Sequence, residues 1–62
     1  MFANLMVQLQ SKVSLSSTQL QALVIAHQLS NETLECLNDC ISGLIDTDQL
    51  FAFVVRILER AK

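Results

Sequence analysis

The stretch LSSTQL at residues 15–20 and its counterpart IDTDQL at residues 45–50 decide the fold of this chain. Each begins with an apolar residue, continues with a Ser or Asp that suits the N-cap of a helix, and places Gln three residues after that cap, as in a capping box. The flanking apolar residues stand where a hydrophobic staple joins N′ to N4. We therefore predict that one helix begins at about Ser17 and another at about Thr47.

Two further helices are predicted from the rest of the chain. Apolar residues recur at helical spacing in the first segment, which predicts a helix from about Ala3 to Lys12. Ser30 offers a cap ahead of acidic residues, and Gly43 suits a left-handed C-terminal cap, which predicts a helix over residues 31–42. Because the connections are short, neighbouring helices are expected to fold back as two helical hairpins. The expected fold is all-α: four short antiparallel helices in a compact bundle.

The composition indicates one small domain with surplus apolar surface. A chain of this size buries only about 60% of the surface that its unfolded form exposes. Here 52% of the 62 residues are hydrophobic and 16% are charged, against about 25% charged in typical soluble domains. This balance excludes disorder and leaves more apolar surface than one small chain can hide. We expect residues 1–62 to form a single helical interaction domain that is dimeric or covered by a partner.

The charge of the chain narrows the class of partner. Four Lys and Arg against six Asp and Glu give a net charge of −2, which lacks the basic excess that nucleic-acid binding requires. The unbroken apolar runs at residues 22–26 and 50–55 are far shorter than a bilayer span. A signal peptide requires a basic residue near its start, and no basic residue precedes Lys12. We expect a soluble, cytoplasmic protein with no nucleic acid, membrane or small-molecule substrate among its partners.

Two of the predicted helices carry the candidate partner-binding surface. No formally charged residue lies between Val13 and Asn31, so the helix that begins near Ser17 has no charged face. In the helix that begins near Thr47, apolar residues cover an arc of about 200°, roughly twice what a surface helix needs. We expect both helices to bury this surplus against a second copy, as a homodimer, or against another protein. The candidate partner-binding residues are Leu23, Val24, His27, Phe51, Phe53 and Val55.

Cys36 and Cys40 are predicted to be reduced thiols beside the apolar side of a helix. Side chains four residues apart in a helix emerge next to each other, but not in disulfide geometry. A metal site made of these thiols and His27 lacks a fourth ligand and the close spacing of a zinc knuckle. A Cys and His pair without a strained turn or a cleft does not make a nucleophilic site. We therefore expect no metal, no cofactor and no enzyme activity.

One segment carries a family-like pattern. It consists of a helix, the turn GLID at residues 43–46, and Gln49-Leu50 at the opening of an apolar helix. In this, residues 37–58 resemble the helical-hairpin turn of small oligomerisation and co-regulator modules such as the SHOCT and TAFH types. The resemblance covers about a third of the chain, and we assign no family on it.

The function that the sequence predicts is a non-enzymatic protein–protein interaction module. It is either a stand-alone adaptor or regulator, or an oligomerisation or docking domain of a longer protein. The alternative from a different class is a small transcriptional regulator that contacts DNA or a DNA-binding partner. That alternative requires a basic face, so the positions of the basic residues in the fold discriminate between the two.

Overall fold

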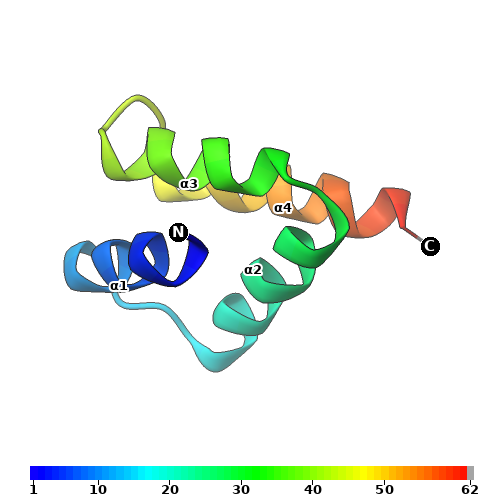
Figure 1. Cartoon of the computed structure of the whole chain (residues 1–62), viewed down its shortest axis with the longest axis horizontal. Coiled ribbons are helices and arrows are strands. Elements are labelled where there is room, and N and C mark those ends of the chain that lie inside the picture. Colours follow the sequence, from blue (N-terminus) through cyan, green and yellow to red (C-terminus); the bar gives the residue numbers. More distant parts are fainter. Residues whose placement is uncertain (62) are drawn as a thin grey trace.

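A computed structural model describes residues 1–61, which contain four helices and no strand (Figure 1). The helices are α1 (Phe2–Lys12), α2 (Ser17–Leu29), α3 (Glu32–Ile41) and α4 (Thr47–Arg60). The radius of gyration, 10.5 Å, is that of a compact domain of this length. The structure confirms the all-α class, the four-helix bundle and the two predicted starts at residues 17 and 47. α1 begins one residue earlier than predicted, and α3 begins one residue later and ends one residue earlier.

Both predicted capping boxes form, and they fix where α2 and α4 begin. At α2, the backbone N–H of Gln19 donates to Ser16 Oγ over 3.2 Å, and the backbone N–H of Ser16 donates to Gln19 Oε1 over 3.0 Å. At α4, the backbone N–H of Gln49 donates to Asp46 Oδ1 over 2.8 Å, and the backbone N–H of Asp46 donates to Gln49 Oε1 over 3.1 Å. Each box satisfies two backbone donors that a bare helix end leaves open.

The end of α3 is a Schellman motif centred on Gly43. Its φ is +86°, in the left-handed region that glycine adopts without a Cβ penalty. The backbone N–H of Leu44 donates to the carbonyl of Asp39 over 2.9 Å, and that of Gly43 donates to the carbonyl of Cys40 over 3.2 Å. These bonds satisfy two carbonyls at the end of α3 and turn the chain toward α4. The left-handed C-terminal cap predicted at Gly43 is therefore confirmed.

The pairing of the helices differs from the predicted pair of hairpins. α3 and α4 pack as the second hairpin, but α1 packs along α3, and α2 packs against α4 and also touches α3. Figure 1 shows α2 leaving the connection at a steep angle to α1 instead of folding back along it. The reason is local, because Val13 (φ −137°, ψ 149°) and Ser16 (φ −75°, ψ 163°) are extended. An extended connection carries the chain away from α1 before α2 begins.

A single core lies where the four helices meet. Half of its buried apolar side chains are leucines, and every helix contributes to it. The buried apolar side chains are Met6, Leu9, Leu23, Ala26, Leu37, Leu50, Val54 and Ile57. Thr33 at the start of α3 is also fully buried, and its Oγ1 has no hydrogen-bond partner among the described residues. Among the buried residues that the structure describes, Thr33 is thus the polar one in an otherwise apolar core.

The capping box of α4 yields a stability prediction. Asp46→Ala removes the acceptor of the Gln49 backbone N–H and should lower the free energy of unfolding by about 1 kcal/mol. Asp46→Asn keeps an oxygen acceptor and should stay close to the wild-type value. Thermal unfolding followed by circular dichroism measures both. Identical melting of the Ala variant and the wild type would contradict this role of the cap.

The buried hydroxyl of Thr33 yields a second prediction, with the opposite sign. Thr33→Val keeps the branched shape and removes the unpaired Oγ1, so it should raise the free energy of unfolding by about 1 kcal/mol. Thr33→Ser keeps the hydroxyl, removes a buried methyl group and should lower it by about 1 kcal/mol. Urea unfolding provides the comparison. A destabilised Val variant would show that the hydroxyl makes a hydrogen bond in solution.

Candidate functional site

The six predicted partner-binding residues do not share one surface. Leu23 is fully buried in the core of a single chain, so a partner has no access to it. Phe51 and Phe53 are half-buried and pack against that core. Val24 and Val55 are exposed, over 41% and 50% of their surface. Of the apolar candidates, only these two are exposed to solvent.

The wide apolar arc of α4 is largely covered inside the chain. α4 packs against α2 and also against α3, so it buries side chains in two directions, whereas a helix with one neighbour buries one stripe. Leu50, Val54 and Ile57 are buried in the core, and Val55 is its large apolar residue that stays exposed. The surplus that predicted a partner for α4 is therefore mostly used within the fold.

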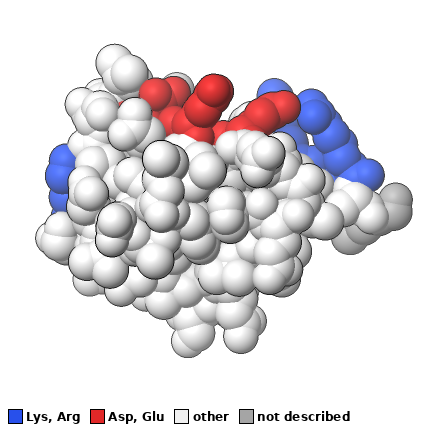
Figure 2. All heavy atoms as spheres, viewed as in Figure 1, with Lys and Arg blue, Asp and Glu red and all other residues white. Residues whose placement is uncertain are grey.

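The outer side of α2 is exposed and carries no charge. Its apolar members are exposed over 41% at Val24, 46% at Ile25 and 51% at Leu29. Two exposed glutamines stand beside them at helical spacing. In Figure 2 the charged side chains gather at the upper edge and the two sides of the molecule, and the lower part, where α2 lies in Figure 1, shows none. We call this surface the α2 stripe: Gln21, Val24, Ile25, Gln28 and Leu29.

His27 makes a contact within the chain. Its ring stacks on Phe2 with the ring centroids 4.1 Å apart and the planes 3° from parallel. The Nδ1 atom is buried and has no hydrogen-bond partner among the described residues. The stack joins the first turn of α1 to the last turns of α2, two helices that do not pack along their lengths. The predicted partner-binding role of His27 thus competes with a structural one.

Two of the basic residues, Lys12 and Arg60, stand at opposite ends of α3. Lys12 Nζ donates to the carbonyl of Ile41, where α3 ends. Arg60 lies near Ser30, just before α3 begins. Figure 2 shows basic side chains on two sides of the molecule with acidic ones between them. Within residues 1–61, Lys12 and Arg60 therefore do not share the single basic face that DNA contact requires, and Lys62 lies outside the described residues.

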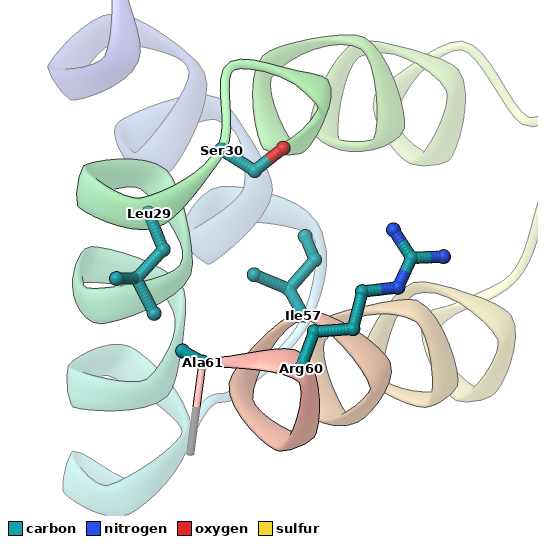
Figure 3. Close-up of a pocket in the computed structure, with 5 residues that line it drawn as sticks. All are labelled: Leu29, Ser30, Ile57, Arg60 and Ala61. Atoms are coloured by element: carbon teal, nitrogen blue, oxygen red, sulfur yellow. The ribbon is translucent and has the colours of Figure 1, made fainter.

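A pocket of about 460 Å³ opens between the ends of α2 and α4. Figure 3 shows Leu29 and Ile57 facing it from the two helices, while the Arg60 guanidinium extends away from Leu29. Ser30 supplies its one hydroxyl, which already accepts a hydrogen bond from the backbone N–H of Glu32 over 3.2 Å. With one ionisable side chain in its lining, this pocket does not offer the paired groups that acid–base catalysis needs.

Two further hollows flank α3. One, of about 450 Å³, lies between α1 and α3, and the other, of about 290 Å³, lies between α3 and α4. Glu35 contributes to both, so it stands on the ridge between them. The first is lined by Met1, Leu5, Leu34, Glu35 and Asn38. The second is lined by Glu32, Glu35, Cys36, Asp39, Ile45, Gln49 and Phe53.

Both cysteines are free thiols, and the pKa of Cys36 is raised. Burial raises the pKa of the Cys36 thiol, and the negative charges of Asp39 and Cys40 raise it further. Because the thiolate is the nucleophilic form, the raised pKa makes Cys36 less nucleophilic than an ordinary thiol. Residues 1–61 hold no group of three His, Cys, Asp or Glu side chains placed to bind a metal ion. None of the four helices has the length and apolar character that crossing a bilayer requires.

Comparison with known proteins finds no family model, no curated protein and no solved structure that matches this chain. The resemblance of residues 37–58 to helical-hairpin turns is therefore not supported by any matching family model. The candidate surfaces are therefore defined by geometry: the α2 stripe on one side of the molecule, and α3 with its two hollows on another.

The raised pKa of Cys36 gives a prediction on reactivity. In a Cys40→Ala variant, Cys36 should react with iodoacetamide several-fold more slowly in the folded chain than in the urea-unfolded chain at pH 8, because less thiolate is present. The difference should narrow as the pH rises through the pKa of the folded state. Asp39→Asn in the same background should speed the folded reaction, because it removes one negative neighbour. Equal rates in the folded and unfolded chains would contradict the shift.

Proposed function

We propose that this chain is a non-enzymatic protein–protein interaction module, an adaptor or regulator, that self-associates through the α2 stripe. One observation carries the proposal: the stripe is exposed, apolar at its centre and uncharged, in a chain of net charge −2. Contiguous exposed apolar surface on a small domain marks an interaction site. The free thiols of Cys36 and Cys40 support a reducing, cytoplasmic setting for this module.

The absence of charge in the stripe favours a second copy of the same chain as the occupant. In a twofold dimer each patch meets its own duplicate, so a charged patch near the axis meets like charge. The α2 stripe avoids this repulsion, whereas the outer side of α3, with Glu32, Glu35 and Asp39, does not. Of the two surfaces, the α2 stripe is therefore the one suited to self-contact.

The chemistry of the stripe suits a contact that leaves no group unpaired. Val24, Ile25 and Leu29 supply apolar area for burial. Gln21 and Gln28 each carry a donor and an acceptor, so they are able to pair with each other across a twofold axis without burying a charge. Such an interface has an apolar centre with neutral polar groups beside it.

The size of the surface sets the expected strength. A stable interface buries about 800 Å² per partner, which is about a fifth of the 4165 Å² that the chain exposes. One face of α2, about 20 Å long by its 13 residues, supplies only part of that area. The proposed dimer therefore belongs to the weak, reversible class, with dissociation in the micromolar range.

Binding is a better account of the chain than catalysis. Burial raises the pKa of the Cys36 thiol and so disfavours its nucleophilic form, and Arg60 is the one ionisable side chain of the pocket in Figure 3. The alternative predicted from the sequence, a regulator that contacts DNA, gains no support from the separate positions of Lys12 and Arg60. A protein partner, here a second copy, remains the proposal.

The proposal predicts how single substitutions change the particle mass. At tens of micromolar, light scattering coupled to size exclusion should give the wild type twice its chain mass of 6.9 kDa. Ile25→Glu buries a charge in the interface and should give the mass of one chain with its helical circular dichroism kept. Leu44→Glu is the matched control, because Leu44 is 75% exposed but lies in the turn after α3. It should leave the dimer intact.

The same experiment is able to overturn the proposal. A wild-type mass of one chain, or an Ile25→Glu variant that stays dimeric, contradicts self-association through the α2 stripe. Leu23→Glu serves as the reference for an unfolded chain, because it places a charge at a fully buried position and should abolish the helical signal. Should Ile25→Glu also lose its helical signal, Leu29→Lys applies the same test at a more exposed position.

A further inference from the structure

We propose that the outer side of α3 is a second docking surface, and that its partner is a basic amphipathic helix of another protein. We call this surface the α3 face, made of the carboxylates Glu32, Glu35 and Asp39 and of the two hollows that flank α3. The proposal goes beyond self-association, because it involves a different helix and a partner of different chemistry. It does not depend on the α2 stripe.

Apolar side chains line the two hollows. Between α1 and α3, Leu5 and Leu34 line a hollow of about 450 Å³. Between α3 and α4, Ile45 and Phe53 line one of about 290 Å³. Hollows of a few hundred Å³ accept large apolar groups. Two of them, separated by one ridge, suit a helix that places apolar side chains on both sides of that ridge.

Carboxylates determine the charge of the partner. Glu32, Glu35 and Asp39 stand three and four residues apart, so they follow one side of α3. All three line the hollow between α3 and α4, and no cationic side chain lines either hollow. Figure 2 shows acidic side chains along the upper edge of the molecule, where α3 lies in Figure 1. This potential attracts a cationic partner and steers its approach.

The spacing of the carboxylates matches a helix better than an extended peptide. From Glu32 to Asp39 the charges span about 10 Å along the α3 axis, or two helical turns. Lys or Arg at positions i, i+3 and i+7 of a partner helix spans the same length, with the apolar residues between them directed at the hollows. The same charges disfavour a second copy of this acidic chain on this face, because its own α3 repeats them.

The two proposed surfaces are compatible. Figure 2 places the acidic side chains at the upper edge of the molecule, away from the uncharged lower part. Arg56 and Arg60 are exposed on α4 and line neither hollow. A dimer formed through α2 then presents two α3 faces, which is the arrangement of a bivalent adaptor.

The test uses a defined probe: a fluorescein-labelled, amidated helical peptide of about four turns, with a leucine stripe bordered by arginines. Anisotropy should show saturable binding to the wild type that weakens as salt is raised. The triple variant Glu32→Gln, Glu35→Gln, Asp39→Asn should bind at least about tenfold more weakly. A matched peptide with glutamate in place of arginine, and another with serine in place of leucine, should both fail to bind.

Amide chemical-shift mapping on the wild type localises the contact without any substitution. The largest shifts should fall on α3 and on residues that line its hollows, such as Leu5 and Phe53. Ile25→Glu should bind the peptide as the wild type does, so loss of the dimer and loss of peptide binding are separate outcomes. Equal affinity of the triple variant, binding of the serine peptide, or shifts centred on the α2 stripe each overturn the proposal.

Discussion

Four leucines, one from each helix, are buried in a single cluster, and the rest of the structure depends on that contact. Leu9, Leu23, Leu37 and Leu50 are at most 1% exposed. Truncating a buried leucine typically costs about 2 to 5 kcal/mol, while a domain of this length has only about 3 to 9 kcal/mol of total stability. Each helix is therefore needed by the other three, and the chain folds as one cooperative unit.

That shared core determines which surfaces remain for other molecules. Since each helix turns its apolar side inward, function has to be sought on the outer sides of the helices. These differ sharply in character: α2 presents glutamines and exposed aliphatic residues without charge, and α3 presents three carboxylates beside two hollows that are lined in part by apolar side chains. One fold thus offers a surface suited to its own copy and a surface suited to a cationic partner, as we propose.

Local signals predicted more than tertiary ones. The starts of α2 and α4 follow from the capping boxes, because the bonds of Ser16 and Asp46 lie within four residues. The pairing of α1 with α3 did not follow, because no Gly or Pro marks the extended connection after Val13. The sequence also did not predict which side of α2 is buried. In a helix without charged residues, apolar periodicity alone does not tell Leu23, which is buried, from Ile25, which is exposed.

The two proposed surfaces rest on opposite physical terms, and this makes them independently adjustable. Contact through the α2 stripe is apolar and neutral, so added salt leaves it intact or strengthens it. Attraction to the α3 face acts between exposed charges, which salt screens over about 8 Å at physiological ionic strength. A partner that neutralises Glu32, Glu35 and Asp39 does not change the electrostatic interaction between two stripes, because the α2 stripe carries no charge. Coupling between assembly and partner binding therefore has to pass through the packing of α2 against α3 and α4, since those helices share the core.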